Sequence, residues 1–144
     1  MQINHIDVYV AKEKWEKVSK VLLETYNCKL LKSVPNSHAY YNLNIIEVNK
    51  INFDDLLNYL NADDDVIRYE ILEVVDKLTS NFEFERRREN IEAKVEIEFD
   101  LERLEHKLTI SVKNKDGCFE LVRFCYFRDF KKAIESATHS LLSI

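Results

Sequence analysis

The sequence contains very little glycine and proline, with one residue of each in 144. Average proteins contain about 7% glycine and about 5% proline. The scarcity argues against long flexible linkers and against glycine-rich loops that bring backbone close to a phosphate, because such loops need several residues without a Cβ. The single glycine follows Asp116, and an Asp-Gly pair between two apolar runs predicts the turn of a β-hairpin.

Long apolar runs are also missing. No run of 18 or more apolar residues occurs, and residues 1–10 have neither the basic start nor the long apolar stretch of a secretory signal. We therefore expect a cytoplasmic protein that does not associate with membranes. The three cysteines, Cys28, Cys118 and Cys125, have no CxxC or CxxH spacing, so we expect reduced thiols in the core rather than disulfides or a zinc site.

The sequence shows no catalytic motif. It has no nucleophile elbow, no Cys/His or Ser/His/Asp arrangement beyond chance, and no Glu-x-x-His helix that would complete a carboxylate metal site. From the residues alone we therefore predict no catalytic residue, no metal ligand and no cofactor.

The charge is unevenly distributed along the chain. Residues 54–105 hold 17 Asp and Glu against 7 Lys and Arg, whereas the rest of the chain has a net charge of +5. A surface of one sign attracts partners of the opposite sign. The sequence pI of about 5.4 disfavours direct binding to nucleic acid, which needs a broad positive field.

The hydrophobic pattern predicts an α+β fold with a single domain over residues 1–144. We expect a mainly antiparallel sheet of five to seven strands with three or four helices. The predicted strands cover residues 2–10, 29–34, 38–48, 91–101, 107–113 and 118–127. The predicted helices cover residues 12–27, 53–60, 63–78 and 129–141.

Three of these segments lead to finer predictions. The helix over 63–78 follows from the helical spacing of Ile67, Ile71, Val74 and Leu78, and the helix from 129 is expected to be capped by Asp129. Residues 118–127 are apolar on both faces, which indicates a central strand covered on both sides. A two-residue hairpin turn at Gly117 would place Lys113 opposite Glu120.

The clearest alternation lies in residues 91–101, where apolar and charged residues take turns without a break. We predict that Glu96, Glu98 and Asp100 face solvent while Ile97 and Phe99 face the core. Alternate strand residues are about 6.5–7 Å apart, close to the spacing of successive phosphates, so this row resembles a polyanion. A solvated outer face is the simpler interpretation. The predicted partner-binding residues are Asp63, Asp64, Asp65, Glu92, Glu96, Glu98, Asp100 and Glu102.

The one basic cluster is Arg86-Arg87-Arg88, preceded by two phenylalanines. Glutamates on both sides neutralise it, so we interpret it as a turn or a strand end rather than as a phosphate or RNA contact.

Two short segments resemble a known family. The opening INHIDVYV, which a helix follows, and the late KDGCFELV are similar to the first and last strands of vicinal oxygen chelate (glyoxalase-like) proteins. The resemblance covers about 20 residues. It implies a metal-dependent enzyme in which His5 and Glu120 are metal ligands, and His5 shares its strand face with Asp7 and Tyr9. The family also has a second βαβββ module, which this sequence does not repeat.

The leading hypothesis is a small acidic protein-binding inhibitor that acts without catalysis. An immunity protein, an antitoxin or a mobile-element anti-defence protein would block a basic, nucleic-acid-acting partner, such as a nuclease toxin, through its acidic surface. Two alternatives stay open: the glyoxalase-like metal enzyme, and an oligomeric structural subunit that associates through residues 118–127 or through exposed aromatic side chains. The sequence does not indicate an oligomeric state.

Overall fold

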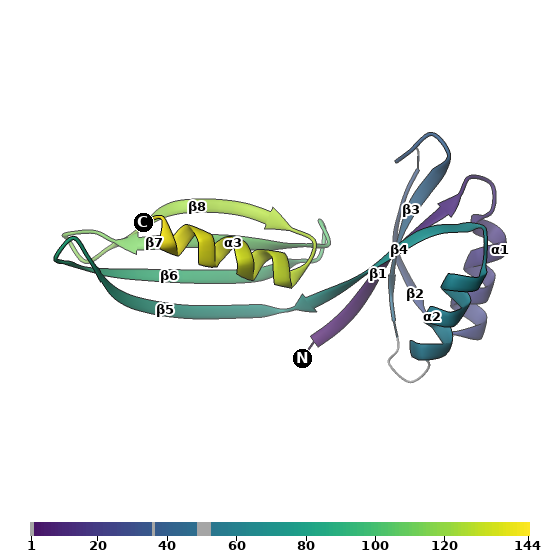
Figure 1. Cartoon of the computed structure of the whole chain (residues 1–144), viewed down its shortest axis with the longest axis horizontal. Coiled ribbons are helices and arrows are strands. Elements are labelled where there is room, and N and C mark those ends of the chain that lie inside the picture. The colour runs from purple at the N-terminus through teal and green to yellow at the C-terminus, as the bar shows by residue number, and fades with distance from the viewer. Residues whose placement is uncertain (1, 36, 49–52) are drawn as a thin grey trace. The chain divides into compact units, whose positions relative to one another are not determined.

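The computed structural model describes residues 2–35, 37–48 and 53–144, and it divides the chain into two compact units. The N-terminal unit covers Ile3–Leu72, and the C-terminal unit covers Glu73–Ile144 together with Gln2. Each is built on a four-stranded antiparallel sheet (Figure 1). The single domain over residues 1–144 stays a prediction, which depends on whether the two units unfold together.

The N-terminal unit has the order β-α-β-β-α-β. Its elements are β1 (Gln2–Ala11), α1 (Trp15–Lys20) with the π-helical continuation η1 (Val21–Thr25), β2 (Lys29–Val34), β3 (Tyr41–Glu47), α2 (Phe53–Ala62) and β4 (Val66–Val75). The last three residues of β4 already belong to the C-terminal unit. The strands lie in the order β2-β3-β1-β4. This is the split βαβ, or ferredoxin-like, arrangement.

The core of the N-terminal unit forms because the apolar face of β1 meets the apolar sides of both helices. Ile6, Val8 and Val10 alternate along β1 and are fully buried, as are Val18 and Leu22. Leu56 and Leu60 of α2 complete the same cluster. Burying one such side chain contributes about 1.5–3 kcal/mol to stability. The alternation in β1 and the helical spacing in α1 and α2 therefore indicated the buried faces correctly.

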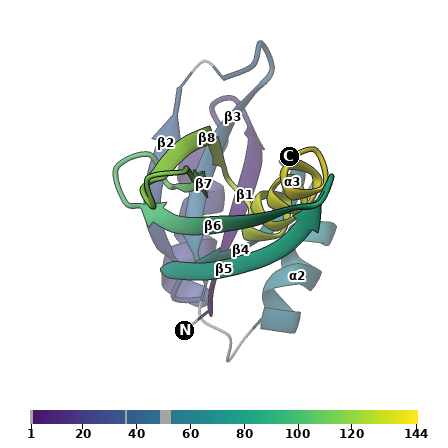
Figure 2. The ribbon, with the colours of Figure 1, turned by 90° about the vertical axis from the view of Figure 1, so that its left-hand side faces the viewer.

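The C-terminal unit is an antiparallel meander followed by one helix. Its elements are β5 (Lys77–Arg86), β6 (Glu89–Asp100), β7 (Glu105–Lys113), β8 (Phe119–Phe127) and α3 (Phe130–Leu142). The strands lie in sequence order, so β5 and β8 form the two edges (Figure 2). Helix α3 lies on one face, where Ala133 and Ala137 pack against Val95, Ile97, Leu108 and Ile110. Alanines allow the helix to approach the sheet closely.

The structure confirms the α+β class but corrects the strand count. The described residues hold eight strands in two sheets and three helices, rather than one sheet of five to seven strands. The error lies in the helix predicted over 63–78, where the chain forms β4 and β5 instead. Val66, Leu72 and Val74 are the buried residues of β4, and Ile67 and Ile71, which suggested a helical stripe, are exposed.

Strand β8 is also different from its prediction. It is an edge strand rather than a central strand, and residues 119–124 are all exposed. The hairpin turn is longer than two residues, because the Asn114 backbone N–H donates to the Cys118 carbonyl at 2.8 Å. The pairing therefore places Lys113 opposite Phe119, and Glu120 opposite Val112. Cys118 is exposed, not in the core.

The arginine cluster lies at a turn, as predicted. Arg86 pairs with Glu89 across the β5–β6 hairpin, so Arg87 and Arg88 are the two turn residues. Both have positive φ, 52° and 67°. A two-residue turn with two left-handed residues is the type I′ turn, which matches the twist of the flanking strands.

None of the helices in the described residues has both the length and the apolar character that a membrane crossing requires.

Candidate functional site

The open face of the β5–β8 sheet carries most of the predicted acidic row. Because Val95 and Ile97 face α3, the even-numbered residues of β6 face away from it. Ile97 is fully buried and Glu98 is exposed, so the predicted register is confirmed. We call this surface the charged face. It consists of Lys77 and Glu83 of β5, Glu92, Lys94, Glu96 and Glu98 of β6, and Lys107 and Lys113 of β7.

Lysines surround the carboxylates of the charged face. Glu96 pairs with Lys94 at 2.9 Å, and Glu92 pairs with Lys113 at 3.0 Å. Glu98 lies between Lys77 and Lys107 on the two neighbouring strands. The hydrogen bond and charge of Lys94 hold the pKa of Glu96 below its ordinary value, so this side chain is ionised at neutral pH. The sequence showed the acids but not that Lys77, Lys107 and Lys113 of the neighbouring strands lie beside them.

Asp100 and Glu102 lie at the end of the row. The Asp100 carboxylate accepts hydrogen bonds from the backbone N–H groups of Glu102 and Arg103, at 2.9 and 3.1 Å. This is the local turn-forming use of an aspartate side chain. Glu102 is exposed in the turn. Asp100 therefore has a structural role in the β6–β7 turn, and Glu102 is the more accessible of the two.

The other predicted acids, Asp63, Asp64 and Asp65, belong to the N-terminal unit and follow the end of α2 instead of beginning a helix. Asp63 accepts hydrogen bonds from the Tyr59 hydroxyl at 2.7 Å and from the Asp65 backbone N–H at 2.9 Å. Lys17 of α1 forms ion pairs with Asp63 and Asp65. These two acids thus tie α1 to the α2–β4 connection, while Asp64 is exposed.

The fold distributes the acidic window over both units. Residues 3–72 hold 11 Asp and Glu against 8 Lys and Arg, and residues 73–144 hold 15 against 13. Each unit is therefore only weakly acidic. The partner-binding role of the eight predicted acidic residues stays a prediction. It now depends on a local pattern of charges rather than on a broad negative field.

The residues of the glyoxalase-like resemblance lie in different units. His5 and Asp7 are buried side chains of β1 in the N-terminal unit, and Glu120 is exposed on β8 of the C-terminal unit. Tyr9 lies beneath Arg68, whose guanidinium carbon is 4.1 Å from the ring centroid. In the described part of the chain, no group of three or more His, Cys, Asp and Glu side chains is placed to hold a metal ion.

His106 is an interior residue that the sequence reasoning missed. It is fully buried between the rings of Phe99 and Phe130. Its Nδ1 lies 3.0 Å from the Arg128 carbonyl, to which it donates, and its Nε2 accepts from the Val75 backbone N–H at 3.1 Å. Burial lowers the pKa of this imidazole, which keeps it neutral as this pair of bonds requires. His106 alternates with Leu108 and Ile110 along β7, and this spacing could have indicated that it faces the core.

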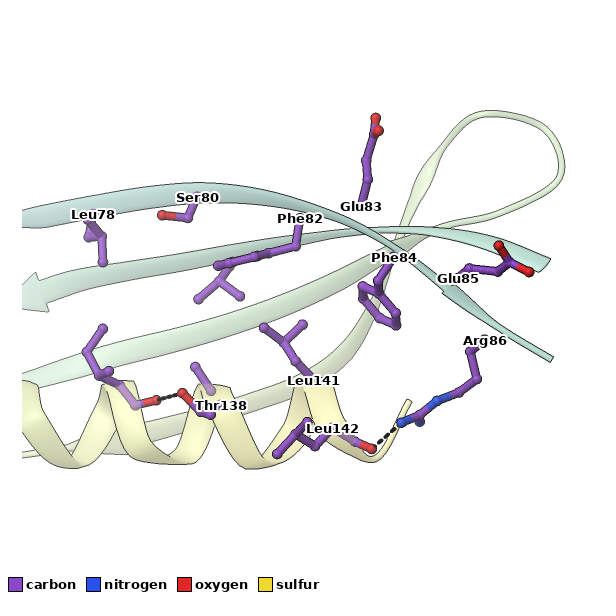
Figure 3. Close-up of a pocket in the computed structure, with 13 residues that line it drawn as sticks. Leu78, Ser80, Phe82, Glu83, Phe84, Glu85, Arg86, Thr138, Leu141 and Leu142 are labelled. Carbon is purple, nitrogen blue, oxygen red and sulfur yellow. Dashed lines mark hydrogen bonds between the residues drawn. The ribbon is translucent and has the colours of Figure 1, made fainter. Parts of the chain in front are cut away.

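A groove lies between α3 and the edge strand β5, on the face opposite the charged face. It encloses about 510 Å³, and apolar side chains such as Phe82, Phe84 and Leu141 line it (Figure 3). At one end Arg86 donates to the Leu142 carbonyl. The groove has the size and lining of sites that accept apolar groups.

Comparison with known proteins gave no match: no family model matches the sequence, and no curated protein and no solved structure matches the chain.

Proposed function

We propose that the chain is a non-catalytic protein-binding protein whose partner docks on the charged face. The observation that carries this proposal is a row of accessible carboxylates on a sheet face with no helix of its unit over it. Glu92, Glu96 and Glu98 follow one strand, and the exposed fractions of the Glu92 and Glu96 side chains are both 41%. From the first to the last of the three the row is about 20 Å long at strand rise, a length suited to a protein interface.

The pairing with lysines is compatible with binding. Exposed ion pairs such as Glu96–Lys94 contribute about 0–1 kcal/mol, so a partner's arginine can replace the lysine at small cost. Arginine also binds a carboxylate through two parallel hydrogen bonds, which lysine cannot do. The bonds to a partner with regularly spaced arginines would therefore contribute more free energy than the loss of the lysine ion pairs costs.

The narrower form of the proposal is an inhibitor. A nuclease toxin or another nucleic-acid-acting enzyme has a basic groove built for phosphates, and the carboxylate spacing on β6 suits such a groove. An immunity protein, an antitoxin or an anti-defence protein would act in this way, and a cytoplasmic location is part of the same proposal.

The test begins with capture of a partner from the native host, followed by measurement of association rates. The variant Glu96→Lys with Glu98→Lys is compared with Glu24→Lys and Glu135→Lys, which change the net charge equally at two exposed acids that are not part of the charged face. We expect the first pair to slow association at least about tenfold at low salt, with a smaller effect at high salt. Asp100 is left unchanged because it holds a turn. Equal slowing by both pairs would reject the charged face as the binding site.

A further inference from the structure

Strand β8 exposes four large apolar side chains. Phe119, Leu121, Val122 and Phe124 are exposed to 43%, 60%, 55% and 48% of their surface. They lie on a nine-residue strand at the edge of the sheet. An exposed edge strand of this length and character is a template for pairing with another strand, and its side chains show which strand fits.

The residues of β8 and its turn form a chemical palindrome. From 118 to 125 the sequence is Cys-Phe-Glu-Leu followed by Val-Arg-Phe-Cys. When two copies run antiparallel about a centre between Leu121 and Val122, each Glu120 meets the other copy's Arg123 and each Phe119 meets the other copy's Phe124. The opposite charges and the aromatic rings are favourable cross-strand pairs, and a two-fold axis forms each of them twice.

A bulge in β8 makes this register geometrically consistent. Directly opposed residues in a sheet must point to the same face. In a regular strand, residues 119 and 124 would point to opposite faces, because they are an odd number of residues apart. In the structure, Arg123 pairs with Ile110 and Leu121 pairs with the next residue, Ser111, so Val122 is an extra residue.

The extra residue changes the parity of every position after it. Phe119 and Phe124 therefore both lie on the charged-face side, opposite Lys113 and Thr109. Glu120 and Arg123 both lie on the α3 side, and the Arg123 guanidinium donates to Ser140 of α3 at 2.8 Å. The residues that the palindrome would pair thus share a face.

We propose that the partner of the β8 edge is a second copy of this chain, joined by antiparallel β8–β8 pairing in the 120–123 register. The two sheets then form one continuous sheet, and because the two-fold axis is perpendicular to it, both charged faces point the same way. This assignment goes beyond the proposed function and does not depend on it, because none of the charged-face residues lies in β8.

The first experiment measures mass against concentration by analytical ultracentrifugation of the full chain. We expect a reversible dimer. Glu120→Arg and Arg123→Glu should each weaken it at least about tenfold, because each introduces two like-charged contacts. An equimolar mixture of the two variants should restore the dimer as a heterodimer. Glu135→Arg, an exposed site on α3, is the matched control. A chain that stays monomeric up to roughly 100 μM, or a mixture that fails to recover, overturns the proposal.

The second experiment reads the register through the cysteines. In the proposed pairing Cys118 meets the other copy's Cys125, at the Cα separation of about 5.5 Å that suits a disulfide. Diamide takes up the two electrons and two protons of the thiols and leaves the S–S bond. Cys28 is buried, and burial raises the pKa of its thiol to about 11, so it stays unreactive.

The expected result is a covalent dimer of the parent chain. Neither Cys118→Ser nor Cys125→Ser alone should cross-link, but a mixture of the two should, because one complementary pair remains. A covalent dimer formed by Cys125→Ser alone would show that Cys118 of one copy lies beside Cys118 of the other copy. That result would overturn the register.

Discussion

The two units are each built on four strands, but they differ in how the chain connects those strands. In the N-terminal unit, helices link strands that are separated in the sheet, and α1 and α2 both contribute to one core. In the C-terminal unit, turns link neighbouring strands, and one helix covers one face. The meander has the more local contacts, and local contacts favour fast folding. It also leaves the more apolar edge: Leu121 of β8 is 60% exposed, whereas Leu30 of β2 is 36% exposed.

The difference teaches where each unit is held together. In the N-terminal unit, ion pairs of Lys17 with Asp63 and Asp65 hold α1 to the α2–β4 connection. In the C-terminal unit, the buried His106 packs against Phe130 of α3. Substitutions at these two positions therefore probe the units separately, and the sole tryptophan, Trp15 of α1, reports on the N-terminal unit alone.

The largest effect is expected for His106→Ala. It removes a fully buried side chain and leaves the Val75 N–H and the Arg128 carbonyl without their bonds to the imidazole. We expect a loss of about 3 kcal/mol or more in the free energy of unfolding, measured in urea by circular dichroism and Trp15 fluorescence. If residues 1–144 are one cooperative domain, both signals shift together. A shift in circular dichroism alone would reject the single domain, and exposed His139→Ala should change neither signal.

A smaller effect is expected for Asp63→Ala. Burial of the Asp63 carboxyl opposes its ionisation, but the bonds from Tyr59 and Asp65 and the charge of Lys17 outweigh it and hold its pKa below the ordinary value. Losing these contacts should reduce stability by about 1–2 kcal/mol, seen in the Trp15 signal because Lys17 lies on the same helix. Exposed Asp64→Ala is the matched control, and equal losses for the two variants would contradict the network.

The β5–β6 turn offers a stabilising change. Arg87 and Arg88 both adopt left-handed backbone, which costs a non-glycine residue roughly 1–2 kcal/mol. The pair Arg87→Asn and Arg88→Gly, the preferred type I′ sequence, should raise the stability of the C-terminal unit by about 1 kcal/mol. Arg87→Lys keeps the unfavourable backbone and should have no effect. A destabilised Asn-Gly variant would mean that the arginine side chains contribute more than the backbone strain.

The smallest effect is a pH dependence. Burial lowers the pKa of His106 in the folded state, so between pH 7.5 and 6 the unfolded state binds more protons than the folded state. The stability that a neutral His106 contributes is complete above the unfolded pKa and declines as the pH falls. The urea midpoint of the C-terminal unit should therefore decrease toward pH 6, and His106→Gln should reduce that slope. An unchanged slope would assign the dependence to other groups.

The sequence predicted best where one pattern acted without a competitor. The sequence over 91–101 alternates without interruption, and burial of Ala93, Val95 and Ile97 confirmed the register, although the strand ends at Asp100 and Leu101 is exposed. β4 was missed because two of its exposed residues, Ile67 and Ile71, happen to be four apart, which imitates a helix. The β-branched residues of that segment favoured a strand and were the better signal.

Other features depend on neighbours that are distant in sequence. Asp129 precedes α3 as expected, but its carboxylate makes no cap bond and instead accepts from the Glu73 backbone N–H at 3.0 Å. The lysines around Glu98 come from two other strands, and their positions follow only from the pairing. The edge position of β8 likewise depends on the order of strands, which a single strand's composition does not encode.

The bulge at Val122 has a consequence for how this protein tolerates insertions and deletions. In a regular strand, removing one residue rotates everything downstream by half a turn about the strand axis, so interior and exterior exchange places. Val122 is the exception, because its loss would make Leu121 and Arg123 consecutive opposite Ser111 and Ile110, and Arg123, Phe124 and Cys125 would keep their faces. Loss of any paired residue of β8 would instead exchange the faces of the residues on one side of it, and Phe119 and Phe124 would no longer share a face. The bulge therefore marks the one place in β8 where a residue can be lost without exchanging the two faces of the strand.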